Sequence, residues 1–384
     1  MNDDSSFATM ASRYQMRSLL VAAIAAVAAL LGALGNRPQF FQSYLFAWLF
    51  WAGISFGSLV IVMMQFLTGG QWGRALLRPA TAAMTILPMV ALFFLPILFG
   101  LGDIYAWAHG SFGEPGSIHH QQQWLKVPFF IGRSVFYFAV LATIGLLLRR
   151  WSIVDVFPGE TPLRLRALSS GGLVSYVLCM NFASTDWVMS LTPGWYSTIF
   201  VVVFMAGQFL AALAMMTFLV IGFARALPVG EMLPTKVFSD LGNMLLAFVV
   251  FWTYVTFSQF LIIWSGNLPK EISWYLERSG GGWPWFAIAL MVGQFALPFA
   301  LLLSRAAKRN RQRLAAICLC ILLANALNNF WLVTPSWHPG GFFVHWMDLA
   351  LFFALGGLWF AAFFHFIKQR ELLSLIQGRW PDHG

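Results

Sequence analysis

Long hydrophobic runs recur along nearly the whole chain, and they limit what it can fold into. A helix that crosses a membrane needs about 20 consecutive apolar residues. Lipid offers no partner to backbone polar groups, so only helices and closed barrels span it. Of the 384 residues, 59% are hydrophobic and only 10% are charged, which leaves too little polar sequence for a separate soluble domain. We therefore expect an all-α polytopic membrane protein with one integral membrane domain over residues 1–384.

The hydrophobic runs predict ten transmembrane helices. These spans lie near residues 18–34, 45–67, 82–101, 129–148, 171–191, 196–223, 240–264, 285–303, 314–333 and 344–367. Pro88, Pro96 and Pro298 fall within runs, so we expect local kinks there, which neighbouring helices can accommodate.

The distribution of basic residues predicts the orientation of these spans. With ten spans, 18 of the 23 Lys and Arg residues fall on the side that carries both termini. The five on the other side are Arg37, Lys126, Arg133, Lys270 and Arg278. Because cytoplasmic loops carry the excess of basic residues, both termini are expected in the cytoplasm. The net charge of +9 thus reflects topology in the lipid bilayer, not nucleic-acid binding.

Two pairs of short segments suggest an internal repeat. Thr192–Trp195 resembles Thr334–Trp337, and Phe50–Gly53 resembles Phe204–Gly207. They predict two parallel four-helix repeats, residues 45–191 and 196–333, with the first and last spans outside them. The two offsets differ, 142 and 154 residues, so a chance similarity is the alternative.

Asp186 lies inside the fifth hydrophobic span, one to two turns from its outer end. A carboxylate at such depth costs roughly 2.5–3.5 kcal/mol on insertion scales, so it usually faces a protein interior, a water-filled cavity or a partner charge. Arg133 lies about one turn below the outer end of the neighbouring fourth span. Two interpretations follow: Asp186 is a station in a proton path, or it forms a buried ion pair with Arg133.

Other polar residues gather at the same predicted depth. Further proton-path candidates are Arg133, Asp103, His345 and Asp348 in the outer half and Asp240 and His365 in the poorer inner half, and quinone-pocket candidates are Gln259, Glu271 and Trp187. The i, i+3 spacing of His345 and Asp348 would place both on one helix face. Asp240 also fits a helix N-terminal cap or charge. Asn325, Asn328 and Asn329 fit interhelical hydrogen bonds. Because the outer half is richer in such groups, we expect an outward-opening half-channel or a quinone-sized pocket.

The sequence argues against an intrinsic redox centre. No CxxCH haem-attachment motif is present. A b-type haem needs two His ligands on facing helices, whereas His345 and His365 belong to one helix. No metal site or catalytic residue is predicted.

Two segments carry a resemblance to a known family. The first is Asn181–Phe200, which contains Phe-Ala-Ser-Thr-Asp-Trp-Val-Met-Ser-Leu. The second is Phe257–Pro269, followed by Glu271 and Trp274-Tyr275. With ten spans and cytoplasmic termini, the chain resembles the ActF family, the second NrfD-like membrane subunits of bacterial alternative complex III.

The resemblance implies a respiratory quinol:cytochrome c oxidoreductase in the bacterial cytoplasmic (inner) membrane. Implied partners are a paralogous NrfD-like subunit, an iron–sulfur protein, and multihaem and monohaem cytochromes c, with a terminal oxidase as a further partner. Haem c and iron–sulfur clusters would then sit on those partners. The subunit resembled here is connected with proton conduction and with quinone or quinol binding. A secondary transporter and a purely structural membrane anchor are the alternative functions.

Overall fold

The structure is a computed structural model that describes residues 2–110, 119–155, 161–226 and 233–369. The described residues form helices and no strands, and ten helical segments are long and apolar enough to cross a membrane. The predicted ten-span, all-α fold is confirmed. The helices start and end as follows: α1 Asn2–Gly35, α2 Arg37–Thr68, α3 Gln71–Met84, α4 Leu87–Leu92, α5 Leu95–Phe99, α6 Leu101–Ile104, η1 Ala106–His109, α7 His119–Trp124, α8 Val127–Asp155, α9 Leu163–Trp187, η2 Met189–Leu191, α10 Phe200–Ala226, α11 Thr235–Gly266, α12 Pro269–Leu276, α13 Trp283–Leu290, η4 Met291–Ala296, α14 Leu297–Leu303, α15 Arg305–Arg309, α16 Arg311–Val333, η5 Thr334–Ser336 and α17 Trp346–Ile367.

Proline interrupts two of the spans. Pro88 and Pro96 occupy the first turns of α4 and α5, so the third span is divided into α3, α4 and α5. Proline lacks the N–H that continues a helix ladder and clashes with the preceding turn. In the eighth span the π-helix η4 separates α13 from α14. Pro298 lies in the first turn of α14, directly after η4. The predicted kinks are therefore confirmed.

Helices α2 and α10 form the centre of the bundle. The most apolar window of α2 is 100% buried and that of α10 is 83% buried, and the two helices pack against each other. Gly57 of α2 makes this approach possible, because a Cβ there would overlap the carbonyl oxygen of Gln208 and lie 2.6 Å from the Cβ of Ala212. Two helix backbones can come this close only where one of them carries no side chain.

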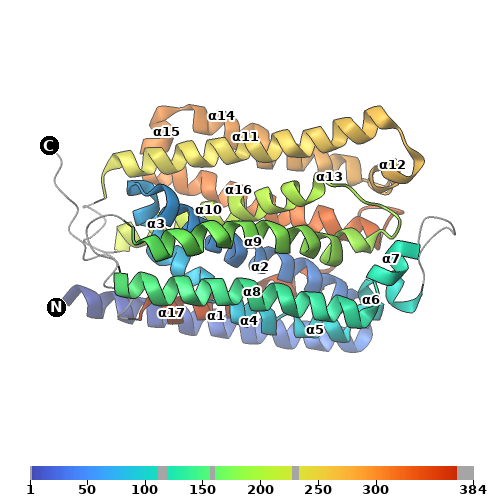
Figure 1. Cartoon of the computed structure of the whole chain (residues 1–384), viewed down its shortest axis with the longest axis horizontal. Helices are drawn as coiled ribbons and strands as arrows, with labels where there is room; N and C mark the ends of the chain where they lie inside the picture. Colours follow the sequence, from blue (N-terminus) through green and yellow to red (C-terminus); the bar gives the residue numbers. More distant parts are fainter. Residues whose placement is uncertain (1, 111–118, 156–160, 227–232, 370–384) are drawn as a thin grey trace.

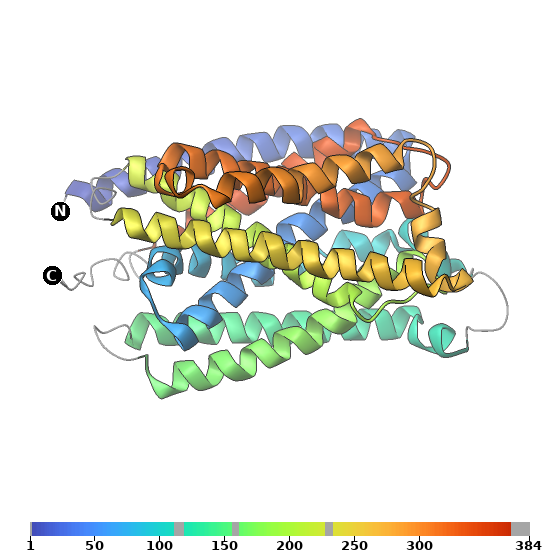
Figure 2. The ribbon, with the colours of Figure 1, turned by 90° about the horizontal axis from the view of Figure 1, so that it is seen from above.

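The other helices surround this central pair (Figure 1). Helix α2 contacts α3 and α9, and α8 contacts α4 and α9. Helix α10 contacts α11 and α16, and α14 packs against both α11 and α16. Helices α8 and α9 run along one edge of the bundle (Figure 2). Helix α17 packs lengthwise on α1 and also touches α2 and α3. The internal repeat itself stays a prediction.

Helices α6, α7 and α12 lie together at one end of the bundle, opposite the start of α1 (Figure 1). We call this end the outer end, following the orientation that the basic residues predict. Spans five and nine finish there in the short helices η2 and η5. The Thr192 hydroxyl, just after η2, lies 3.2 Å from the Ser336 hydroxyl of η5. The similar turns after spans five and nine are therefore in direct contact.

Candidate functional site

Asp186 lies near the outer end of α9 and is completely buried. Arg133 of α8 holds its carboxylate through two bonds: Nε donates to Oδ2 at 2.9 Å and Nη2 donates to Oδ1 at 2.8 Å. The predicted ion pair is confirmed, and it has the two-pronged geometry that guanidinium and carboxylate groups favour.

Two aromatic side chains complete the surroundings of Asp186. Trp124 Nε1 donates to Oδ1 at 2.8 Å, and the Tyr137 hydroxyl donates to Oδ2 at 2.9 Å. The Arg133 guanidinium carbon also lies 4.0 Å from the Trp124 ring centroid, and Nη1 donates to the Trp124 carbonyl at 2.9 Å. Each carboxylate oxygen thus has two donors, all of them from protein side chains. This arrangement favours the structural interpretation of Asp186 over a proton station.

Trp187, next to Asp186, faces the packed interior of the protein. It is completely buried, and its indole N–H donates to the Ser134 hydroxyl at 3.2 Å. Its carbonyl accepts a bond from Tyr105 at 2.9 Å. Its ring contacts five aromatic side chains, namely Trp48, Phe56, Phe94, Tyr137 and Phe138. These contacts are those of a core residue.

His345 and Asp348 come together, but not on one helix face as predicted. His345 is the N-cap of α17 and lies outside the helix. Its Nδ1 accepts a bond from the Met347 N–H, and its own N–H donates to Asp348 Oδ2 at 2.8 Å. This reciprocal arrangement is a capping box, which satisfies donors at the helix start. Ser43 and Gln39 of α2 both donate to Asp348 Oδ1, so the pair also joins α17 to α2.

The remaining proton-path candidates are dispersed. Asp103 forms an ion pair with Arg37 at 3.1 Å near the outer surface. Asp240 is not a helix cap, because Pro234 is the N-cap of α11 and Asp240 lies in the second turn. It therefore stays a helix N-terminal charge at most. His365 is exposed in the last turn of α17, at the other end of the bundle. The structure thus places the proton-path candidates in separate groups instead of along one continuous path.

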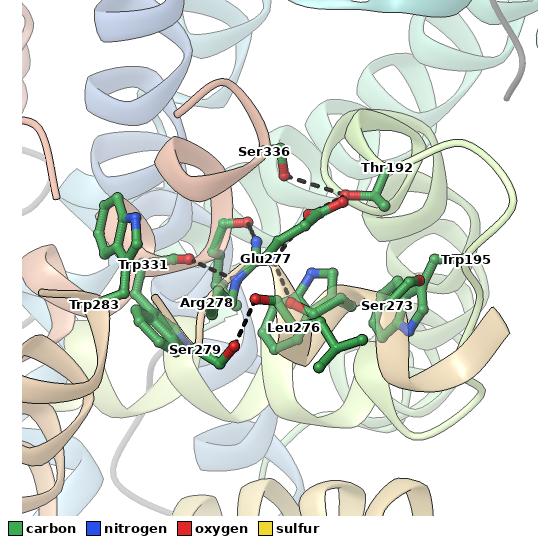
Figure 3. Close-up of polar contacts among 12 residues, drawn as sticks. Thr192, Trp195, Ser273, Leu276, Glu277, Arg278, Ser279, Trp283, Trp331 and Ser336 are labelled. Atoms are coloured by element: carbon green, nitrogen blue, oxygen red, sulfur yellow. Dashed lines mark hydrogen bonds and ion pairs between the residues drawn. The ribbon is translucent and has the colours of Figure 1, made fainter. Parts of the chain in front are cut away.

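The sequence interpretation missed a second charge pair at the outer end, formed by the partly buried Glu277 and the buried Arg278 (Figure 3). Arg278 is only 3% exposed, and its guanidinium carbon lies 3.6 Å from the ring centroid of Trp274. Glu277 Oε2 lies 3.4 Å from Arg278 Nη1 and accepts a bond from the Thr192 hydroxyl at 3.3 Å. Thr192 in turn meets Ser336, so this cluster connects the loop after α12 with the ends of spans five and nine.

Arg278 also caps the end of α16. Its Nη2 donates to the Leu332 carbonyl at 3.0 Å and its Nε to the Trp331 carbonyl at 3.3 Å. Burial lowers the pKa of Arg278 to about 9, an effect that Glu277 opposes, so the guanidinium is charged at neutral pH. Burial likewise raises the pKa of Glu277, and here Arg278 and Thr192 act in the opposite direction. Two adjacent opposite charges in an outer loop were the only sequence signal for this pair.

The raised pKa of Glu277 predicts a pH-dependent stability. The folded state binds the Glu277 proton more tightly than the unfolded state, whose pKa is about 4.3. The bound proton therefore stabilises the folded state fully below about pH 4.3, the pKa in the unfolded state. This stabilisation is lost as the pH rises through the folded-state pKa of Glu277. We expect the thermal midpoint of Glu277→Gln, minus that of the wild type, to increase with pH over this window. Thermal unfolding in detergent at a series of pH values measures it, and parallel curves for the two proteins would contradict it.

Three side chains on the face of α11 that packs against the bundle carry polar atoms without a partner among the residues that the structure describes. Trp252 Nε1, Thr256 Oγ1 and Gln259 Oε1 are all buried and unpaired. Their i, i+4, i+7 spacing places them on one helix face, a signal that the sequence did contain. Gln294 in the π-helix η4 is completely buried, and neither of its amide atoms has a partner in the described part of the chain. At the outer end, burial raises the pKa of Tyr275 to about 12, an effect that the Gln259 side chain opposes.

A small polar cavity lies between α2, α10 and α16. Its volume is about 10 Å³, and its lining consists of Leu49, Phe50, Gly53, Phe204, Gly207, Gln208, Ala211, Asn325, Asn328, Asn329 and Leu332. Asn325 and Asn329 are hydrogen-bonded to each other at 3.1 Å, and the Tyr176 hydroxyl donates to Gln208 Oε1 at 2.8 Å. A cavity of this volume holds about one water molecule.

The three quinone-pocket candidates are not brought together at this cavity. Gln259, Glu271 and Trp187 do not line it, and its volume is far below that of a quinone ring. Glu271 lies in the first turn of α12, where its carbonyl accepts a bond from Trp195 Nε1 at 2.9 Å. A quinone pocket stays a prediction. Among the residues that the structure describes, no three His, Cys, Asp or Glu side chains are placed to hold a metal ion.

Fold and site together define a multi-pass, all-helical membrane protein with ten candidate spans and two charge pairs at one end, each with one fully buried member. Comparisons of the chain with protein-family models and with curated proteins found no match.

Proposed function

We propose that this chain is a membrane subunit of a respiratory quinol:cytochrome c oxidoreductase, of the alternative complex III type. In this role it carries no redox centre and contributes a proton half-channel that opens to the outer face. The two segments around Asp186 and Gln259 support the assignment to this complex, since they carry the sequence resemblance. The partner cytochromes c and the iron–sulfur protein belong to the same proposal.

The row of unpartnered polar atoms on α11 is the observation that carries the half-channel. A buried polar group without a partner costs about 1–3 kcal/mol, so water is expected to reach these atoms. Gln259 lies seven residues from the outer end of α11, Gly266, and Trp252 lies 14, or about 10 and 21 Å at 1.5 Å per residue. The hydrocarbon core is about 30 Å thick. The row thus extends from the outer face to the middle of the membrane.

Asp186 has a different part in this proposal. Its four donors come from protein side chains, whereas a proton station needs a lone pair that water can reach. We assign the Asp186–Arg133 pair to fixing α8 and α9 together, and the conducting groups to the interior between α11 and α16. The motif around Asp186 that carries the family resemblance then has a structural role in the subunit.

The contacts at the outer end argue against the transporter alternative. Trp195, after span five, donates to the Glu271 carbonyl of α12, and Trp337, after span nine, donates to the Ile104 carbonyl of α6 at 2.8 Å. The first predicted four-helix repeat is thus bonded to the outer loop of the second, and the second to the outer loop of the first. Alternating access requires one group to rock against the other, which these reciprocal bonds and the α2–α10 contact oppose.

The assignment to a complex is tested by purification from the native membrane. We expect the chain to co-purify with a multihaem cytochrome c and an iron–sulfur protein. Isolation of the chain alone, with transport of a solute after reconstitution in liposomes, would contradict the proposal. A complex that assembles but releases no protons beyond those of quinol oxidation would favour the anchor alternative.

Thr256→Val tests the half-channel directly. Valine has nearly the shape of threonine and removes only a hydroxyl that has no partner among the described residues, so assembly is expected to be unchanged. We expect several-fold slower proton release in the assembled complex in liposomes, measured with a pH-sensitive dye during quinol oxidation. Thr253→Val is the matched control on the same helix, because the Thr253 hydroxyl bonds the Val249 carbonyl of its own helix. Equal proton release by both variants and the wild type would exclude this route.

A further inference from the structure

Three N–H donors converge on the space beside Gly207 of α10. A Cβ at Gly207 would lie 3.5 Å from Asn325 Nδ2, 3.8 Å from Trp252 Nε1 and 3.9 Å from Asn328 Nδ2. These donors come from α11 and α16. Asn325 Nδ2 already donates to the Gly207 carbonyl at 3.0 Å. The Trp252 nitrogen, by contrast, has no acceptor among the residues that the structure describes.

Trp252 gives an independent indication of a ligand. Its side chain is 5% exposed, and its indole N–H has no partner in the part of the chain that the structure describes. Because an indole N–H can only donate, its partner must be an acceptor. Trp252 does not itself line the cavity, but its Nε1 lies 3.8 Å from the position of a Cβ at Gly207, and Gly207 lines the cavity together with Asn325 and Asn328.

We propose that one water molecule binds in this cavity, between Gly207, Trp252 and Asn328. The cavity volume of about 10 Å³ is just enough for a single water molecule. Residues that line the cavity are amides, glycines, alanine and apolar side chains without a formal charge, so an ion would be left without a counter-charge. A buried water usually makes about three hydrogen bonds. It accepts from the indole and amide N–H groups and can donate to an amide oxygen on α16 or α10.

This water would connect polar groups of different helices. The Gln208 side chain lines the same cavity and is bonded to Tyr176 of α9, which lies 11 residues before the end of that helix, or about 16 Å from it. The water would thus join the interior of α11 and α16 to the middle of the membrane at Tyr176. The binding site stands on its own observations, and only its part in proton transfer rests on the proposed function.

Hydroxyl-radical footprinting by X-ray radiolysis tests the site in the purified, assembled complex, because buried side chains beside a bound water become labelled. We expect Phe204 and Leu332, which line the cavity, to be labelled in the wild type. In Gly207→Ala the methyl group takes the space of the water, and its nearest neighbour at 3.5 Å is an ordinary contact. Labelling should therefore be lost while the fold is retained.

Gly222→Ala is the matched control on the same helix, since a Cβ there meets nothing within 4 Å. It should keep wild-type labelling. Absence of labelling in the wild type, or equal labelling in Gly207→Ala, would overturn the water site. The wild-type measurement decides the question even if Gly207→Ala does not fold. Proton release by the same variants is a separate measurement: lost labelling with normal release would leave the water site intact and contradict the proposed proton path.

Discussion

Arg133→Gln is expected to lower the free energy of unfolding by about 3–5 kcal/mol, enough to prevent stable assembly. The change leaves the Asp186 carboxylate completely buried with only Trp124 and Tyr137 as donors. A buried charge without its counter-charge is among the most destabilising changes that a protein can undergo. Yield of the folded subunit and its thermal midpoint in detergent measure the effect.

The double variant Arg133→Gln with Asp186→Asn is the control for this prediction. It replaces the ion pair by two neutral amides, which can hydrogen-bond each other, so most of the lost stability should return. Comparison of the single and double variants gives the coupling free energy between the two sites. Near-additive effects would show that the pair is not a structural unit, and Asp186 would regain the role of a proton station.

Gly57→Ala is expected to destabilise the bundle by about 3 kcal/mol, the upper end of the range for overpacking. The added methyl would overlap the backbone carbonyl of Gln208 and crowd Ala212, and neither helix of the central pair can move without displacing its other neighbours. The thermal midpoint and the yield of folded protein in detergent measure this change.

Two other glycines are matched controls for Gly57. At Gly53, one turn earlier on α2, a Cβ would lie 3.3 Å from the Gln208 Cγ, a flexible side-chain atom, so alanine should cost much less. At Gly132 of α8 a Cβ meets nothing within 4 Å, so alanine should be neutral or slightly stabilising, since it favours the helix. If all three variants had the same stability, the α2–α10 approach would not be the critical contact.

Part of the candidate site could be predicted from the sequence, and part of it could not. Arg133 and Asp186 could be paired because neighbouring spans place both at one depth. Tyr137 lies one turn after Arg133 on the same helix and could have been added to the pair. Trp124 could not, because it lies in α7 before the span, and only the packed loop returns its indole to the carboxylate.

His345 and Asp348 show why spacing alone was insufficient. An i, i+3 pair shares a helix face only if both residues are inside the helix, whereas α17 starts at Trp346. The same spacing at a helix start forms a capping box, in which the backbone donors compete for both side chains. Boundaries to within one residue decide between these outcomes, and hydrophobic periodicity does not define boundaries so closely.

The sequence alone determined the class and the number of spans, because lipid imposes one requirement on every segment: apolar side chains and an internally hydrogen-bonded backbone over about 20 residues. That requirement is local and is visible in any single run. Tertiary structure alone decided which polar groups are satisfied. Asp186 has four donors, whereas Trp252 and Gln294 have no partner in the described part of the chain, although all three are buried polar residues in apolar spans. The difference lies in the neighbouring helices, since hydrogen bonds depend on distances of a few ångströms between segments far apart in the chain.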